Sequence, residues 1–579
     1  MTLDTATDAP PALSRRGLLA AAAVAGGVAL APAPLAHAAS AAGELSPTGD
    51  LPLRLSEEIQ GDVLAGFRKD HVHLLLLTMT DPAAARDWLR ALLPQLATTR
   101  QVASFNEKFS QSRAESGGID PAGMSALWAG LSLSHPGLAL LAGQDPLPGG
   151  AAGTAEAFRQ GPAERADLLG DTGESAPEGW LFGAPGTPVV HAVLTLAADH
   201  PGKLAAALDR QRAAAGQAGI RIAFQQDGAT LPGPAAGQEH FGYQDCISQP
   251  GVRGFDPAEP GRPEQVAGRP GSRLLPAGKF VVGRGRTGGR PTGLPAWALD
   301  GSFQVVRRLA QDVPGWLNQV ETQLAVLKAA GAAPADAPRE WLGARLVGRW
   351  PSGAPVARCP YADPGRGAAR SDAERSDAAR SDAARASADR TGADDFGFDF
   401  NDFGFAEDPQ GWTTPLFSHL RKSNPRDGLV LQPGGRPLAA GELDAHRIIR
   451  RGLPYGPAHT PGADSGPHGP RTPRGLLFVS YQADLVDQFE FIQRRWIDDQ
   501  DFPPKRTPKP GADPVLGPDG PVAFETPSGA FSSQVIPLYF HRFVRTEGAL
   551  YTFTPSLTVL RRLAEGHLDT TPLSAPTQG

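Results

Sequence analysis

Short apolar runs alternate with amphipathic segments along most of the chain, a pattern that predicts alternating strands and helices. The clearest pair comes first, because an apolar strand at residues 71–79 precedes a helix at 81–96. Asp81 suits the N-cap of that helix, and Pro82 suits its first turn. The expected strands are 71–79, 189–197, 220–226, 278–282, 302–309, 476–482 and 550–553, and the expected helices are 81–96, 200–214, 314–329, 484–497 and 556–564. The same theme occurs twice, which indicates two similar halves.

A glycine-rich loop at residues 283–288 does not stand between a strand and a helix. It therefore lacks the context that a dinucleotide-binding fingerprint needs. Two ferredoxin-like α+β halves packed together fit the alternation better than a doubly wound sheet does. Periodicity alone does not settle the choice between these two folds.

Two unusual segments follow the predicted helix at 314–329. Residues 370–385 repeat a five-residue unit of alternating charge without a large apolar side chain, so they form either a disordered stretch or a short exposed helix. Residues 394–405 contain five phenylalanines, which form too apolar a group to be left in water. We expect them to dock on the body of the protein, either over the entrance of a cofactor site or as simple surface packing.

Composition excludes several classes of function. The chain of 579 residues is 41% hydrophobic, which suffices for a large core or two domains. Its net charge of −6 argues against nucleic acid as a partner. The two cysteines, Cys246 and Cys359, belong to no Cys-x-x-Cys or Cys/His cluster, which argues against zinc, iron–sulfur clusters and covalently attached heme. They are either two free thiols or one disulfide.

The N-terminus has the features of an export signal. Adjacent arginines at 15 and 16 precede a moderately apolar run at residues 18–35, and Ala-His-Ala at 36–38 matches a cleavage site. We expect a twin-arginine signal at residues 1–38; a Sec signal and an uncleaved anchor are the alternatives. The partner would be the twin-arginine machinery, which exports folded proteins, and the mature chain would be extracellular or in the cell envelope. No later segment has the roughly 18 apolar residues of a membrane span.

Three polar residues are candidates for chemistry. His419 lies within a run of cations, and a neutral imidazole binds heme iron strongly while cations suit the heme propionates. Asp245 lies in a loop rich in Gly and Pro and can act as a general base. Arg450 can stabilise negative charge on a leaving oxygen. Each also has a structural alternative: a core histidine, a turn-capping aspartate or a surface arginine.

Four segments together resemble the dye-decolorizing (DyP-type) heme peroxidase family. Gly-Tyr-Gln-Asp-Cys at 242–246 resembles the GxxDG loop of the family, and His-Leu-Arg-Lys-Ser-Asn-Pro-Arg at 419–426 resembles its proximal histidine segment. Arg-Arg-Gly-Leu-Pro-Tyr-Gly at 450–456 resembles the segment of the distal arginine. Gly-Leu-Leu-Phe-Val-Ser-Tyr-Gln at 475–482 resembles the pocket strand that follows. Order and spacing agree over about residues 55–565.

The resemblance implies a fold of two ferredoxin-like α+β halves, similar to a dimeric α/β barrel, with heme in the C-terminal half. After the signal peptide, it implies an N-terminal domain at 39–240, a heme-binding domain at 241–565 and a tail at 566–579. Residues 364–395 look like a low-complexity insertion in the second domain.

The resemblance also implies a peroxidase that uses hydrogen peroxide to oxidise dyes, phenolics or other bulky donors in one-electron steps. His419 would be the axial ligand of a non-covalent heme b, and Asp245 and Arg450 would act on the peroxide. The other residues implied to contact the heme are Arg421, Leu476 and Phe478. Leu476 and Phe478 would do so as alternate positions of one strand. Heme carriage and removal of iron from heme are the alternatives, and the presence of both Asp245 and Arg450 argues against carriage.

One position departs from the family pattern. The last glycine of GxxDG is Cys246 here, so a side chain stands beside the distal carboxylate. We expect this side chain to tilt the loop or to narrow the peroxide channel. Its thiol would also be open to oxidation to a sulfenic acid.

Overall fold

The computed structural model describes residues 51–573, with gaps at 118, 122, 148, 286–292, 366–400, 402, 431–437, 439, 461–471 and 530–531. The expected signal peptide, the charged repeat and most of the phenylalanine-rich segment lie outside the described residues. Among the described residues, no helix is long and apolar enough to cross a membrane.

The first half is a four-stranded antiparallel sheet in the order β2-β3-β1-β4. Its strands are β1 (His71–Thr78), β2 (Leu127–Leu133), β3 (Ala192–Ala198) and β4 (Arg221–Ala229). Its helices are α2 (Pro82–Leu92), α3 (Thr99–Glu115), α4 (His135–Ala142), α5 (Thr154–Glu164) and α6 (Pro201–Gln217). As predicted, the Asp81 side chain caps α2 by accepting from the backbone N–H groups of Ala83 and Ala84.

The second half repeats this order, as β10-β12-β9-β15, with β11 beside β12. Its strands are β9 (Ser302–Gln311), β10 (Ile449–Arg450), β11 (Leu453–Tyr455), β12 (Gly475–Gln482) and β15 (Val544–Thr554). Its α-helices are α7 (Val313–Ala329), α8 (Arg339–Val347), α12 (His419–Ser423) and α13 (Leu557–Ala564). Both halves therefore have the antiparallel strand order of a ferredoxin-like unit, and the predicted fold class is confirmed.

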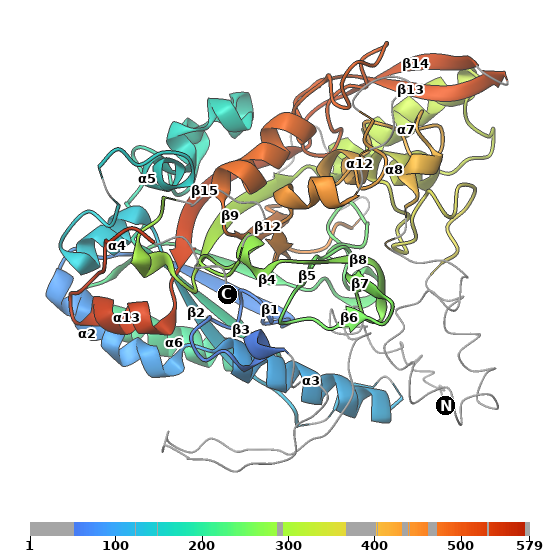
Figure 1. The fold of residues 1–579 in the computed structure, drawn as a ribbon. Helices are drawn as coiled ribbons and strands as arrows, with labels where there is room; N and C mark the ends of the chain where they lie inside the picture. The colour runs from blue at the N-terminus through green and yellow to red at the C-terminus, as the bar shows by residue number, and fades with distance from the viewer. Residues whose placement is uncertain are drawn as a thin grey trace, which may run out of the picture.

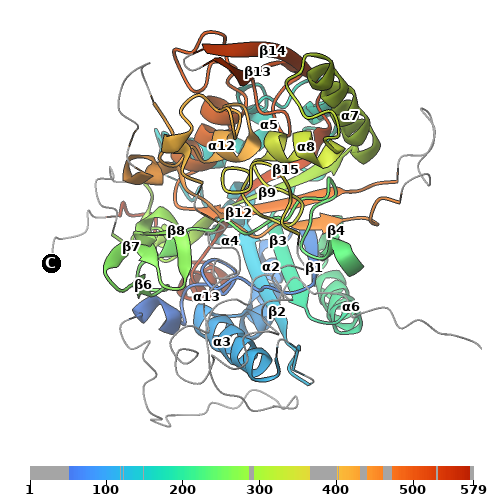
Figure 2. The same ribbon diagram turned by 90° about the vertical axis from the view of Figure 1, so that its right-hand side faces the viewer.

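The two halves form one continuous sheet. β15 pairs with β2 at Phe553 and Leu133, and at the far edges Gly228 of β4 lies against Leu453 of β11. Helices α2, α3, α6 and α13 lie on one side of the molecule, and α7, α8 and α12 lie on the other (Figures 1 and 2). The domain boundaries expected at 39–240 and 241–565 stay predictions.

β1 is buried on both faces, which explains its unbroken apolar sequence. Leu75 and Leu77 belong to the core beneath α2, α6 and α13, whereas Leu74 and Leu76 belong to a second core on the other face.

The side chains of β12 alternate between the two faces of the sheet, and this alternation decides which of them face the candidate site. Leu477 and Val479 of β12 lie in that second core, so Leu476 and Phe478 point the opposite way.

Several elements differ from the predictions. The strand expected at 278–282 is wrong: Ala277–Lys279 is a 3₁₀ turn, and the backbone N–H groups of 280 and 281 bond back to Ala277. The helix expected at 484–497 consists of π-helical turns, Leu485–Glu490 and Ile492–Ile497, after an Asp484 N-cap. A small sheet and a hairpin were not predicted: β5 (Gly251–Val252), β6 (Ala258–Glu259), β7 (Arg262–Val266) and β8 (Arg269–Leu275), and β13 (Gly520–Gly529) with β14 (Ser532–Phe540).

Candidate active site

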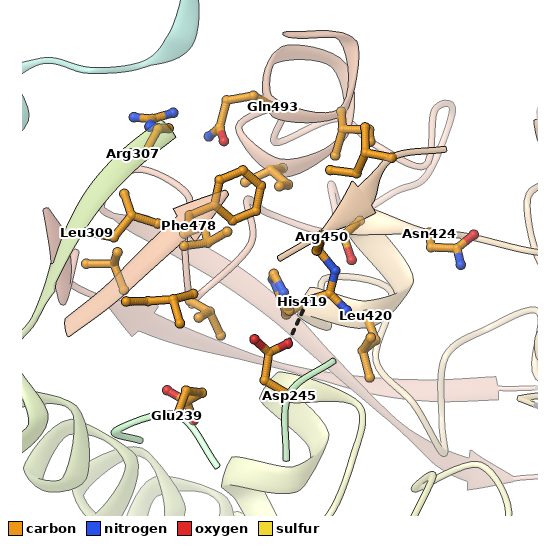
Figure 3. A pocket seen from close by; sticks show the side chains of 18 of the residues that line it. Glu239, Asp245, Arg307, Leu309, His419, Leu420, Asn424, Arg450, Phe478 and Gln493 are labelled. Carbon is orange, nitrogen blue, oxygen red and sulfur yellow. Dashed lines mark hydrogen bonds and ion pairs between the residues drawn. The ribbon is translucent and has the colours of Figure 1, made fainter. Parts of the chain in front are cut away.

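A large cavity lies in the second half, against the face of the sheet that carries Leu476 and Phe478. Residues 239–250, which lead into β5, form a second wall, and the N-terminal end of α12 contributes His419. The π-helical segment adds Phe489, Ile492 and Gln493. The cavity thus brings together five of the six residues that sequence singled out: Asp245, His419, Arg450, Leu476 and Phe478. Figure 3 shows Asp245, His419 and Arg450 converging on its centre.

His419 is held by a carboxylate that the sequence did not reveal. Its Nδ1 lies 2.6 Å from Oδ2 of Asp513, which is completely buried. Burial disfavours a charged imidazole, but Asp513 outweighs this effect and raises the pKa of His419. A carboxylate on Nδ1 fixes the orientation of the ring and leaves Nε2 as the nitrogen that can bind a metal.

Asp513 itself is fixed from several sides. Its Oδ1 accepts the backbone N–H of Val515 at 2.7 Å, and its own N–H bonds to the carbonyl of Ile497. It follows His419 by 94 residues, and no motif around it marks a partner for a histidine. Sequence reasoning could not find this contact because only the tertiary fold brings the two segments together.

Asp245 and Arg450 form an ion pair on the cavity wall. Nη1 of Arg450 donates to Oδ1 of Asp245 at 2.6 Å, and Nη2 donates to the carbonyl of Ser248 at 3.2 Å (Figure 3). Gln249 exchanges two hydrogen bonds, each 3.1 Å, with the backbone of Arg450. Burial works against the charge on Arg450, but Asp245 outweighs it and raises the pKa of the guanidinium. The two side chains are therefore fixed relative to each other as an ion pair.

Cys246 contacts the same carboxylate. Its backbone N–H donates to Oδ1 of Asp245 at 2.6 Å, and its Sγ lies 3.6 Å from Oδ2. Its φ of 62° is in the left-handed region, which costs a residue with a side chain on the order of 1 kcal/mol. This backbone conformation explains why glycine suits the position. Cys246 and Cys359 are both free thiols, so the disulfide alternative is wrong.

Glu239 is a half-buried residue of the cavity wall, and sequence analysis did not single it out. Its two oxygens accept the backbone N–H groups of Phe241 and Tyr243, at 2.9 and 3.0 Å, and Oε2 also accepts from Nε2 of Gln311 at 2.6 Å. Burial raises the pKa of Glu239 to about 7 despite these bonds, and the charge of Asp245 adds to the rise. Glu239 therefore braces the turn that leads to Asp245.

The raised pKa of Glu239 predicts a pH effect on stability. Between its ordinary value of 4.5 and about 7, the folded protein binds a proton that the unfolded chain has released. Stability therefore falls as pH rises through this window, by about 3 kcal/mol. Urea denaturation at several pH values should show this loss for the wild type and not for Glu239→Gln. Parallel pH profiles of the two proteins would contradict the assignment.

Arg421 does not lie where the sequence placed it. It is 2% exposed and is not among the residues that line the cavity. Its guanidinium donates to the carboxylate of Asp408 at 3.2 Å and to the carbonyls of Asp408 and Thr414, and it lies 4.8 Å from the ring centre of Phe405. The expectation that it contacts a cofactor is corrected, because these contacts turn the side chain away from the cavity.

Arg421→Ala should therefore lower the free energy of unfolding and leave the rate of the catalysed reaction unchanged. Removing one member of a largely buried ion pair leaves Asp408 uncompensated, which costs about 3 kcal/mol. Chemical denaturation should show this loss, while the rate of reaction with hydrogen peroxide in the folded protein stays at the wild-type value. Arg561→Ala is the matched control, since its side chain is 55% exposed. A peroxide rate that falls with the Arg421 variant would restore the cofactor role.

Part of the phenylalanine-rich segment docks on the body, as expected. Phe403 and Phe405 are 2% and 0% exposed. Arg349 and Arg426 lie 4.7 and 4.5 Å from the ring centre of Phe403. Since Arg349 also lines the cavity, the docked end of this segment lies next to the site.

Comparisons with known proteins show which family the chain resembles. A family model described as the DyP dimeric alpha+beta barrel domain matches residues 58–230. The chain is 30% identical to Peroxidase 2 of Mycetinis scorodonius, over 87% of this chain and 86% of that protein. It is also 30% identical to a dye-decolorizing peroxidase of Mycena epipterygia, over 88% and 86%. The solved structure of an ancestral D-type dye decolorizing peroxidase is similar, with a TM-score of 0.67, 30% identity and coverage of 89% of this chain and 99% of that one.

Proposed function

Because the chain belongs to the dye-decolorizing peroxidase family, we propose that it is a heme peroxidase that uses hydrogen peroxide to oxidise dyes, phenolics and other bulky donors in one-electron steps. The observation that carries this proposal is a single cavity bearing both a histidine–carboxylate pair and an aspartate–arginine pair. The first pair suits an axial metal ligand, and the second suits acid–base chemistry on a peroxide.

The residues of the cavity fit a non-covalent heme b. His419 would supply a nitrogen ligand to the iron, with its ring oriented by Asp513. Leu476, Phe478 and Phe489 provide apolar walls for a porphyrin. With Arg421 turned away, the cavity-lining cations Arg349 and Arg447 are the ones we assign to the propionates.

Asp245 and Arg450 have different roles in the reaction with peroxide. The Asp245 carboxylate accepts the proton of the near oxygen of hydrogen peroxide and returns it to the far oxygen, which leaves as water. Arg450 stabilises the negative charge that develops on that leaving oxygen, and its hydrogen bond to Asp245 holds that carboxylate in position. Heme, when bound, supplies the iron at which the O–O bond breaks and the capacity to take up electrons singly.

We also propose that the protein is exported in a folded state by the twin-arginine pathway, to the cell envelope or the exterior. The arginine pair at 15 and 16 and the Ala-His-Ala site at 36–38 support this proposal. Loading of a non-covalent cofactor before export would be consistent with it.

The test of the proposed function is a reaction of the purified, heme-loaded protein. We expect a Soret band and peroxide-dependent bleaching of an anthraquinone dye and oxidation of 2,6-dimethoxyphenol, each abolished when peroxide is omitted. Release of protoporphyrin IX without dye oxidation would instead assign removal of iron from heme. Stable heme binding with neither activity would assign carriage, and either result would overturn the proposal.

A further inference from the structure

Asn401, at the described end of the phenylalanine-rich segment, contacts four separate parts of the chain. Its Oδ1 accepts from Oγ of Ser248 at 2.7 Å and from Nη2 of Arg349 at 3.0 Å. Its Nδ2 donates to Oγ of Ser272 in β8 at 3.2 Å. Its backbone carbonyl accepts from Nη1 of Arg426 at 3.0 Å. The side chain and carbonyl of this residue thus join residues 245–250, the small sheet, the segment after α8 and the segment that follows His419.

Ser248 is the second member of this junction. Its Oγ, besides donating to Asn401, accepts from Arg349 at 2.8 Å and from Arg426 at 3.0 Å. Its backbone carbonyl accepts from Nη2 of Arg450. Ser248 therefore connects the Asn401 junction directly to the guanidinium that pairs with Asp245, three residues earlier in the chain.

Phe403 packs against the two arginines of this junction. Its buried ring packs against the guanidinium groups of Arg349 and Arg426, which lie 4.7 and 4.5 Å from the ring centre and also converge on Ser248 and Asn401. Phe405 extends the contact, since its backbone N–H donates to Asp427 at 3.2 Å and its side chain packs against Gly428. We call Asn401 and residues 403–405 the strap. The strap joins residues 245–250 to residues 419–428.

Close packing leaves the strap little freedom. A Cβ on Gly271, whose φ is 69°, would lie 2.5 Å from the backbone of Asn401, and one on Gly428 would lie 2.3 Å from Cβ of Phe405. Both approaches require glycine, so the strap is fitted to its surroundings and is not a loosely attached loop.

We propose that Asn401 is a positioning residue for the Asp245–Arg450 pair, acting through Ser248 as the anchor of the strap. The inference rests on the proposed function, because it takes this pair as the group that acts on peroxide. The phenylalanine-rich segment thereby contributes a residue that supports the geometry of the active site. Loosening the strap frees residues 245–250 without removing any group that touches the peroxide.

The buried thiol of Cys246 provides a direct readout, since it is 5% exposed and adjacent to Asp245. In Asn401→Ala, full-length protein as purified should react with iodoacetamide at Cys246 at least about tenfold faster, because hydrogen bonds to charged groups that hold the loop are lost. The rate at Cys359, measured in the same sample by mass spectrometry, should not change. The rate of reaction with hydrogen peroxide should fall while KM for the dye stays constant.

Two variants make this experiment decisive. Asn401→Asp keeps the acceptor for Ser248 and Arg349, and the Ser272 hydroxyl can turn to donate to it, so labelling and peroxide rates should return close to wild type. Asn318→Ala, an exposed position on α7, should behave as wild type. Unchanged labelling of Cys246 in Asn401→Ala, equal acceleration at both thiols, or no rescue by Asn401→Asp would overturn the proposal. The labelling result does not depend on peroxidase activity, so failure of the proposed function would be recognised separately.

Discussion

Asp245→Asn should slow the reaction of the heme-loaded protein with hydrogen peroxide by at least about a hundredfold, since a positioned general base contributes 10²–10⁴ in rate. The amide keeps the shape of the side chain and can still lie beside Arg450, but it cannot accept the peroxide proton. The Soret band should be retained, because Asp245 is not a ligand. Stopped-flow absorbance after mixing with peroxide gives the rate directly.

Asp87→Asn is the matched control, since the Asp87 side chain is 74% exposed on α2. Arg450→Leu should also slow the peroxide reaction, and the double variant with Asp245→Asn should be little slower than either single variant, because the pair acts as a unit. Wild-type rates in Asp245→Asn would remove this residue from the mechanism. Strictly additive losses would show that the two residues act independently.

His419→Ala should have the other large effect, on retention of heme. The substitution removes the nitrogen proposed to bind iron and leaves the Asp513 carboxylate completely buried without its partner. Loss of a residue that only orients a ligand costs about 10–100-fold in metal affinity, which sets the expectation for Asp513→Asn. His419→Ala should exceed this loss. Transfer of heme to an excess of apomyoglobin, followed by absorbance, measures both variants.

Protein stability has to be checked alongside this transfer. Circular dichroism should show that His419→Ala is folded before its heme loss is interpreted, and His541→Ala, with a side chain that is 61% exposed, is the matched control. A His419 variant that keeps heme as firmly as the wild type, with an unchanged Soret band, would exclude His419 as the ligand.

The sequence pattern predicts strands and helices correctly where the local sequence determines the local structure. The runs that form β1, β9 and β12 each precede a helical segment with an aspartate N-cap, and β1 and β12 are also rich in apolar residues. The prediction of a strand failed at residues 278–282. This apolar run is buried, but its backbone forms a turn and does not pair with another strand. The hairpin β13–β14 was missed because its strands contain prolines at 521, 527 and 537, which weaken a strand signal.

The site shows the same division. Asp245, His419 and Arg450 were singled out because each lies in a short segment that resembles a motif of the family. Leu476 and Phe478 were singled out because the resemblance implies a pocket strand, and all five residues line the cavity. Arg421 was misplaced since the number of cations near a histidine does not say which way each side chain points. Asp513, Glu239 and the Asn401 junction depend on contacts between segments distant in sequence, and only the fold reveals them.

The most direct test of the central claim is a crystal structure of the heme-loaded protein with cyanide bound. We expect iron coordinated by Nε2 of His419 on one face of the porphyrin, with Asp513 on Nδ1. Cyanide should occupy the other face, within reach of Asp245 and Arg450. Iron bound by any other side chain, or cyanide on a face that Asp245 and Arg450 do not line, would contradict it.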